Sequence, residues 1–208
     1  MTAQNCGTGE ARARSSRTAR RRRVTAVIAA AVVLASCAAA LDFCTTSGRA
    51  SSRVVDGNIV MYAAGHEPLV PAIAATSLTG APVRLSAYRS SVLVLNFWAS
   101  WCAPCNAEAS TLEVAYQEYH SQGVDFLGDD LDDSLTGALS FDREYGISYA
   151  SINDPSDAFV QQFSQAALIN DPPTTAVIKS GHLVGMILGR ASSGDLAALI
   201  HQAKTANA

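Results

Sequence analysis

The hydrophobic positions of the chain form short runs that alternate with segments of helical spacing. The clearest run is Val92–Phe97, Val-Leu-Val-Leu-Asn-Phe, which has the length and composition of a strand buried on both faces. Residues 103–120 follow with apolar positions spaced among Glu and Gln, a pattern typical of a helix. The run at 124–127 predicts a second strand that ends at Gly128. The acidic stretch Asp129–Asp133 comes next and predicts a solvated loop.

The second half of the chain continues this alternation and ends in a hairpin and a helix. We expect a helix over 135–145, a short strand over 148–152, a helix opened by Pro155 and running through Phe163, a strand over 174–178, a turn at Ser180-Gly181, a returning strand over 183–188, and a helix over 195–203 capped by Ser192 or Ser193. A small hairpin is also predicted at 79–85. Strands that alternate with helices predict an α/β fold, with helices on both faces of a sheet.

The N-terminal segment has the plan of a secretory leader. Residues Arg12–Arg23 are strongly basic, and Val24–Ala35 follow as an apolar stretch that is short for a membrane span. The stretch ends in Leu-Ala-Ser-Cys at 34–37, which resembles the bacterial lipobox. We therefore expect a leader over residues 1–37 and a lipidated Cys37. An ordinary cleavable signal and an uncleaved signal anchor are the alternatives.

Composition divides the rest of the chain into a linker and a domain. Residues 38–65 are rich in Ser, Thr, Gly, Arg and Ala, and we expect a flexible tether there, before a domain over residues 66–205. Cys44 lies in the tether, where an unused thiol and an intermolecular disulfide are both open. From Cys37 onward, 8 basic and 17 acidic residues give a formal charge of −9. A domain this acidic has no electrostatic reason to bind nucleic acid.

The candidate chemistry lies at Trp101-Cys102-Ala103-Pro104-Cys105, where the buried strand ends and the first helix begins. Two cysteines at this spacing can form a disulfide within the first helical turn. The free amides and positive dipole end of a helix stabilise a thiolate, and Cys102 stands nearest to that end. We therefore predict that Cys102 attacks a partner's disulfide and that Cys105 resolves the mixed disulfide. A purely structural disulfide is the alternative.

We expect neither a metal nor a cofactor. A zinc site needs about four ligands, but the sequence has no second close cysteine pair and its histidines are scattered. The acidic stretch at 129–133 lacks the Gly and the terminal Glu of a calcium loop.

The segment Asn96–Cys105, Asn-Phe-Trp-Ala-Ser-Trp-Cys-Ala-Pro-Cys, resembles the active site of the TlpA/ResA/CcmG-like thioredoxin family of bacterial envelope redox proteins. The redoxin and AhpC/TSA-type proteins are its wider relatives. The resemblance covers most of residues 67–203. It implies a thioredoxin fold, which is a central mixed β-sheet flanked by helices, with an N-terminal β-hairpin extension.

The resemblance also implies roles for single residues. Pro173, in Pro-Pro-Thr-Thr at 172–175, matches the family's cis-proline opposite the cysteines. Glu108, three positions after Cys105, matches a partly buried glutamate that exchanges protons with the thiols. A plain loop and a solvated glutamate are the alternatives. Trp98 is expected in the core, and contacts to a partner are implied for Trp101, Pro104, Pro172 and Thr174.

The family resemblance implies a thiol–disulfide oxidoreductase tethered to the extracytoplasmic face of the cell membrane. Its partners would be exported thiol proteins, among them apocytochrome c, and a membrane redox relay protein. Reduction of exported disulfides is expected, as in cytochrome c maturation. Two alternatives stay open: an oxidase that introduces disulfides into secreted proteins, and a non-catalytic lipoprotein that binds partners through the thioredoxin surface.

Overall fold

A computed structural model describes residues 52–55, 57–89, 91–131, 133–167, 169 and 171–206. The expected leader, Cys37 and Cys44 lie outside these residues. Within them, no helix combines the length and the apolar character needed to cross a membrane. The strands are β1 (Ser52–Val55), β2 (Ile59–Tyr62), β3 (Ala74–Thr76), β4 (Pro82–Arg84), β5 (Val92–Trp98), β6 (Val124–Leu131), β7 (Ala150–Asp154), β8 (Thr174–Lys179) and β9 (His182–Leu188). The helices are α2 (Ala103–Tyr119), α3 (Leu135–Tyr145), α4 (Ala158–Phe163) and α5 (Ser193–Thr205), with 3-10 turns η1 (Leu85–Tyr88) and η2 (His120–Gln122).

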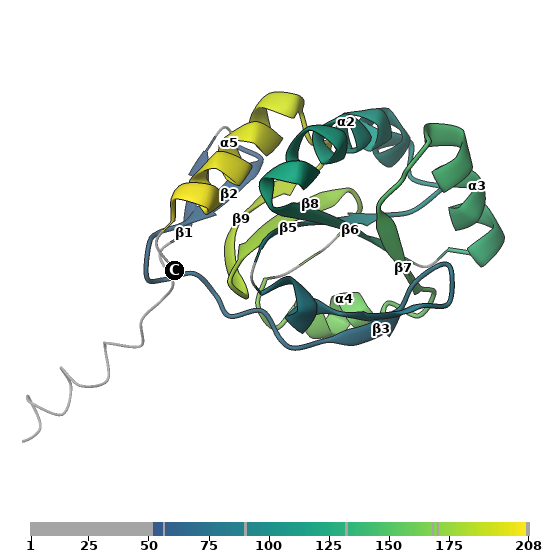
Figure 1. Ribbon diagram of the computed structural model, residues 1–208, viewed down its shortest axis with the longest axis horizontal. Helices are drawn as coiled ribbons and strands as arrows, with labels where there is room; N and C mark the ends of the chain where they lie inside the picture. The colour runs from purple at the N-terminus through teal and green to yellow at the C-terminus, as the bar shows by residue number, and fades with distance from the viewer. Residues whose placement is uncertain are drawn as a thin grey trace, which may run out of the picture. The chain divides into compact units, whose positions relative to one another are not determined.

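A mixed sheet in the order β1-β2-β9-β8-β5-β6-β7 forms the centre of the described part of the chain (Figure 1). β5 runs parallel to β6 and antiparallel to β8, and β6 runs parallel to β7. Every residue of β5 is buried, as the run Val92–Phe97 predicted. A strand buried along its whole length needs cover on both faces of the sheet. The expected α/β fold with a central mixed sheet flanked by helices is confirmed.

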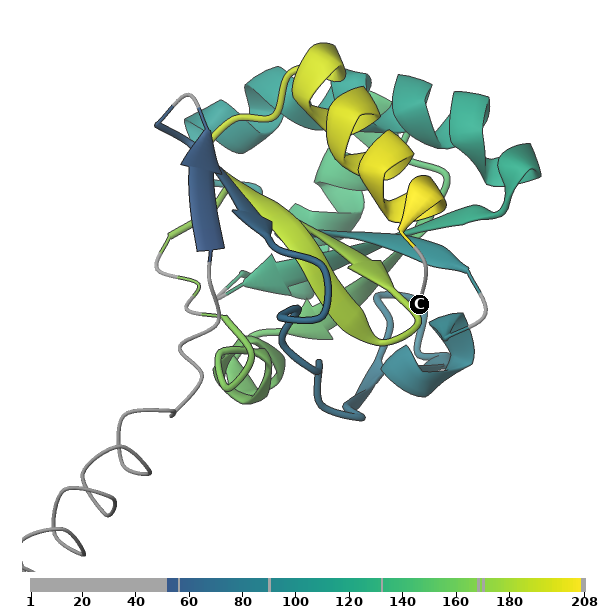
Figure 2. The ribbon, with the colours of Figure 1, turned by 90° about the vertical axis from the view of Figure 1, so that its left-hand side faces the viewer.

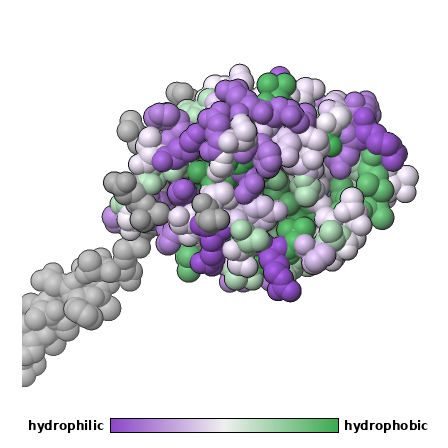
Figure 3. All heavy atoms as spheres, in the orientation of Figure 1, coloured by the Kyte–Doolittle hydropathy of each residue, from purple (hydrophilic) through white to green (hydrophobic). Residues whose placement is uncertain are grey.

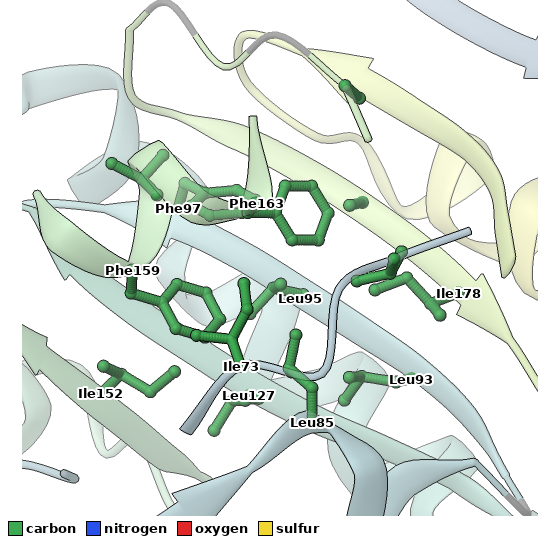
Figure 4. Close-up of a cluster of buried hydrophobic side chains, with 14 of the residues drawn as sticks. Ile73, Leu85, Leu93, Leu95, Phe97, Leu127, Ile152, Phe159, Phe163 and Ile178 are labelled. Carbon is green, nitrogen blue, oxygen red and sulfur yellow. The ribbon is translucent and has the colours of Figure 1, made fainter. Parts of the chain in front are cut away.

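Two layers of helices supply that cover. Figure 2 shows α2 and α5 on one side of the sheet and α4 on the other. Alternate side chains of β5 therefore enter different clusters, with Val94 in the cluster of the α2 and α5 leucines. On the other side, Leu95 and Phe97 belong to the cluster drawn in Figure 4, where the ring centroids of Phe97 and Phe163 lie 5.0 Å apart.

Serine side chains fix where two of the helices begin. The Ser134 hydroxyl accepts the Gly137 N–H at 3.0 Å at the start of α3. The Ser192 hydroxyl accepts the Asp195 N–H at 3.1 Å at the start of α5, which confirms Ser192 as one of the two predicted caps. Such a cap satisfies a backbone donor that the helix itself leaves without a partner.

Both predicted hairpins are present. β3 and β4 pair antiparallel in a separate two-stranded sheet, at the place expected for the N-terminal hairpin. β8 and β9 are joined by Ser180 and Gly181, whose φ angles of 53° and 82° belong to the left-handed region. Two such residues make the tight turn that matches the twist of a hairpin.

The expectation of a flexible tether up to residue 65 is wrong for residues 52–62. β1 pairs with β2, and β2 pairs antiparallel with β9 in the main sheet. The physical reason lies in the Ile-Val-Met-Tyr run at 59–62, which is prone to form strands and places Ile59 in the core at 6% exposure. Gly57, with a φ of 75°, lies in the connection between the two strands. The folded domain therefore includes Ser52 and does not start at residue 66.

Three other boundaries differ from the sequence-based expectations. β6 continues past Gly128 to Leu131, so Asp129 and Asp130 belong to a strand and not to the predicted loop. α4 begins at Ala158 and not at Pro155, which lies in the turn before it. The strand expected at 148–152 lies at Ala150–Asp154.

Candidate active site

The cysteine motif lies where β5 passes into α2. Cys102 takes the N-cap position of α2, and its sulfur accepts the N–H of Cys105 at 3.2 Å. Pro104 stands in the first turn, where its missing N–H costs no helical hydrogen bond, and it is exposed. The motif thus follows the end of β5, and α2 begins at Ala103, directly after Cys102, with Pro104 as its second residue.

Cys102 and Cys105 form a disulfide with their Cα atoms 5.2 Å apart. Cys102 is 4% exposed and Cys105 is 1% exposed, so both sulfurs lie at or below the surface. Cys102 stands at the helix end, where free amides and the dipole favour a thiolate, and Cys105 lies one turn deeper. This arrangement supports the predicted roles of attacking thiol for Cys102 and resolving thiol for Cys105.

The Pro172–Pro173 peptide bond is cis, the geometry that the family resemblance implied for Pro173. Pro173 directly precedes β8, and the pairing of β8 with β5 sets Thr174 opposite Phe97. The proline loop and the cysteine motif therefore lie at the same edge of the sheet. Pro173 is buried, its carbonyl accepts the Gly189 N–H at 2.9 Å, and Pro172 is half-buried.

The two remaining partner-contact residues differ in how they can meet a partner. Trp101 is 60% exposed beside Cys102, as expected for a contact surface. Thr174 is 3% exposed, and its hydroxyl donates to the Asp171 carbonyl at 3.1 Å. The expectation of a partner contact is therefore wrong for the Thr174 side chain, because its hydroxyl closes the proline loop from within.

Glu108 is fully buried one helical turn beyond Cys105. Its carboxylate accepts hydrogen bonds from Asn96 Nδ2 at 2.9 Å and from the Ala191 N–H at 2.5 Å. Burial raises the pKa of Glu108 to about 7, although these two bonds and the nearby Arg190 act in the opposite direction. A solvated helix glutamate is excluded, and the carboxyl can gain or lose a proton near neutral pH.

Nothing in the sequence indicates that the Ala191 N–H donates to Glu108. It belongs to the loop between β9 and α5, 83 positions away from Glu108. Asn96 also donates to Thr175 Oγ1 at 3.1 Å, so the amide links Glu108 to β8. Two parts of the fold, β5 through Asn96 and the loop before α5 through Ala191, therefore hold the Glu108 carboxyl in place.

Trp98 packs under the motif, as expected from the sequence. It is 3% exposed and stacks on Phe141 of α3 with ring centroids 4.2 Å apart. Gly128 makes room for its indole, because a Cβ there would lie 2.6 Å from Trp98 Nε1 and 2.3 Å from Ser151 Oγ. Any side chain at position 128 would displace the Trp98 indole from its place under the cysteine motif.

The sequence does not indicate Asp133 as a site residue, because the acidic stretch at 129–133 predicts a solvated loop. Its Oδ2 accepts the N–H of Ser100 at 2.8 Å, and its Oδ1 accepts the N–H of Ser134 at 2.6 Å. Ser100 immediately precedes Trp101, so this carboxylate fastens the motif loop to the start of α3. An Asp-Ser pair directly before a predicted helix was the signal that could have indicated such a contact.

Replacing Asp133 with alanine should lower the free energy of unfolding by about 1–3 kcal/mol, because two amide donors lose their acceptor. Urea denaturation of the oxidised protein measures this loss. Asp133→Asn keeps an acceptor oxygen and should lose less. A loss below about 0.5 kcal/mol for Asp133→Ala, the range of an ordinary surface change, would contradict this role.

The prediction of a solvated acidic loop is also wrong for Asp129 and Asp130, since both are fully buried in β6. Neither carboxylate oxygen of Asp129 has a hydrogen-bond partner among the described residues. Burial, with added repulsion from Asp154 and Asp130, raises the pKa of Asp129 well above its usual value. Burial, followed by Asp133 and Asp142, raises the pKa of Asp130 to about 8. Asp132 lies outside the described residues.

The chain is similar to known proteins in sequence. The Redoxin family model matches residues 63–199. The thiol-disulfide oxidoreductase ResA of Geobacillus kaustophilus is 29% identical over 126 residues, which cover 61% of this chain and 71% of the relative. ResA of Bacillus subtilis is 27% identical over 111 residues, covering 53% of this chain and 60% of the relative.

Solved structures agree with the sequence comparison. A secreted thiol-disulfide isomerase from Corynebacterium glutamicum superposes with a TM-score of 0.65 at 28% identity, covering 71% of this chain and 93% of that one. A DsbF homologue from Corynebacterium diphtheriae gives a TM-score of 0.65 at 28% identity, covering 74% and 99%. With the Cys102–Cys105 disulfide at the start of α2, these matches show that the chain belongs to the redoxin family and is a thiol–disulfide oxidoreductase of thioredoxin fold.

Proposed function

We propose that the protein reduces disulfides of exported proteins while held at the extracytoplasmic face of the cell membrane by a lipid on Cys37. The observation that carries the chemistry is the Cys102–Cys105 disulfide at the start of α2, above a buried Glu108. The location is supported by the basic and apolar leader before Cys37. It is also supported by the similarity to the thiol-disulfide isomerase from Corynebacterium glutamicum, which is described as secreted.

Reduction proceeds by two exchanges of sulfur partners. The Cys102 thiolate attacks one sulfur of the partner's disulfide, and the partner's other sulfur leaves as a thiolate that takes up a proton. The Cys105 thiol then loses its proton and attacks Cys102 Sγ. The bond between Cys102 and the partner breaks, and the partner leaves with its second thiol. Two electrons and two protons have passed to the partner, and the Cys102–Cys105 disulfide remains.

Glu108 serves the second exchange. Its pKa of about 7 lets the carboxylate take up a proton near neutral pH, such as the one that Cys105 must lose before it attacks. Its hydrogen bonds to Asn96 and Ala191 hold the carboxyl in place during this transfer. The protein itself is reduced again by a membrane redox relay, and apocytochrome c is the exported partner that the family resemblance suggests.

One observation favours the opposite direction as a second candidate function. In the oxidised protein the Cys105 N–H donates to Cys102 Sγ. The same donor bonds more strongly to a thiolate, so together with the helix end it stabilises the reduced protein. A strongly stabilised thiolate makes an oxidase that introduces disulfides. The reduction potential of the pair separates the two functions, because a value near about −270 mV supports the reductase and one near about −120 mV supports the oxidase.

Trapping with Cys105→Ser tests the function and the location together. Without its resolving thiol, the protein should accumulate mixed disulfides at Cys102 with its natural partners, in the membrane fraction. Identification of the trapped chains as exported proteins supports the proposal. If Cys102→Ser trapped partners and Cys105→Ser did not, the two roles would be reversed, and trapped cytoplasmic chains would refute the extracytoplasmic location.

A further inference from the structure

A groove of about 310 Å³ runs from the cysteine motif toward α4. At its motif end it is lined by Trp101, which directly precedes Cys102, and by Pro172, which directly precedes the cis-proline. Its far side is formed by α4. A polypeptide whose cysteine reacts at Cys102 comes close to these two residues, so the groove is open to the segment on one side of that cysteine.

The floor of the groove is apolar. Leu131 and Val160 are 7% and 8% exposed, and Ile169 beside them is half-buried. Figure 3 shows that hydrophilic side chains gather over α2 and α5. With the exposed indole of Trp101 at one end, this floor can take up an apolar side chain of an extended peptide.

Among the residues that the structure describes, two charged residues line the groove, and both are acids. Asp157 stands at the start of α4, and Asp171 stands in the proline loop next to Pro172. The groove therefore presents a negative rim above an apolar floor, on a domain that is itself acidic.

We propose that this groove selects disulfide partners that carry a lysine or arginine next to an apolar residue, close to the reactive cysteine. The apolar side chain packs on Leu131 and Val160, and the basic side chain meets Asp157 and Asp171. Opposite charges across an interface accelerate association, and like charges oppose it. The inference rests on the proposed exchange at Cys102, and it adds to that exchange a preference for one class of partner.

Two short peptides test this preference. Each carries an intramolecular disulfide and an apolar residue beside one cysteine, and they differ only in having Lys or Glu next to that residue. The rate constant of exchange is measured with the reduced protein and the oxidised peptide, and again with both redox states reversed. The result then does not depend on the direction used in the cell. The ratio of the Lys rate to the Glu rate is the readout, and it is unaffected by partial loss of folded protein.

For the natural sequence we expect the Lys peptide to react about tenfold faster than the Glu peptide at low salt, since each exposed charge pair changes the rate by a few-fold. In the double variant Asp157→Asn and Asp171→Asn this ratio should fall to about threefold or less. Asparagine has the shape of aspartate without its charge, and it also tolerates the φ of 57° at position 157.

Glu144→Gln is the matched control, because it removes one exposed carboxylate from α3, an element that does not line the groove. It should keep the tenfold ratio. Equal rates of the two peptides with the natural sequence would overturn the inference. So would an equal fall of the ratio in Glu144→Gln and in the double variant, since that result assigns the preference to the overall charge. If neither peptide reacts in either direction, the proposed function itself fails.

Discussion

Replacing Cys102 with serine should abolish disulfide exchange. The rate is expected to fall by at least about three orders of magnitude, because a serine hydroxyl stays protonated at neutral pH and cannot replace a thiolate as the attacking group. The role of attacking thiol is assigned to Cys102 and not to Cys105, because of the two only Cys102 stands at the N-cap of α2. Turnover of a protein disulfide by the purified protein, in the presence of a reductant, measures the loss.

Cys105→Ser should behave differently. It should also lose turnover, but one equivalent of partner should still be captured at Cys102, since the first exchange does not need the second thiol. Cys44→Ser, a change of a cysteine outside the motif, is the control and should keep full turnover. Substantial turnover by Cys102→Ser would refute the assignment of the attacking thiol, and loss of turnover in Cys44→Ser would show a third cysteine in the reaction.

The oxidised protein should lose stability as the pH rises from about 4 to about 8. An exposed aspartate and an exposed glutamate have ordinary pKa values of 3.8 and 4.5, and burial raises those of Asp130 and Glu108 to about 8 and about 7. The pKa of Asp129 is shifted in the same direction. The folded state therefore holds protons that the unfolded state releases. The stability is fully present below pH 4 and is lost through this window, by an amount on the order of 5 kcal/mol.

Urea denaturation at several pH values measures this loss, in the oxidised form so that the cysteines do not titrate. Asp130→Asn and Asp129→Asn replace an ionisable carboxyl with an amide of the same shape. Each variant should match the natural protein at pH 4, lose less stability toward pH 8, and give a flatter profile in combination. Glu144→Gln, an exposed change on α3, should leave the profile unaltered. Parallel profiles for the natural protein and the double variant would contradict the role assigned to the buried acids.

The sequence was informative where a pattern is local. The apolar run of β5, the cysteines at the following helix start and the Ser192 cap all depend on neighbours within a few positions, so the fold class and the redox pair could be predicted. Pro173 and Glu108 needed the family resemblance, because nothing in their immediate neighbours shows that they lie beside the cysteines.

The missed features depend on distant partners. Asp133 meets Ser100 across 33 positions, and the Ala191 N–H meets Glu108 across 83. A run of carboxylates such as Asp129 and Asp130 predicts a solvated loop, because charged residues are seldom fully buried without a partner. In the fold they belong to a strand that is covered on both faces, and this position overrides the preference of the residues themselves.

The hairpin of β1 and β2 covers the outer side of β9 in the main sheet. Gly185 of β9 allows this close approach, since a Cβ there would lie 2.6 Å from the Val60 carbonyl oxygen. A shortened chain that started at residue 66 would leave the backbone donors and acceptors of β9 without cover, and such an open edge readily pairs with another chain. Aggregation or dimers of a protein truncated in this way would then reflect the missing hairpin and say nothing about the natural state of assembly.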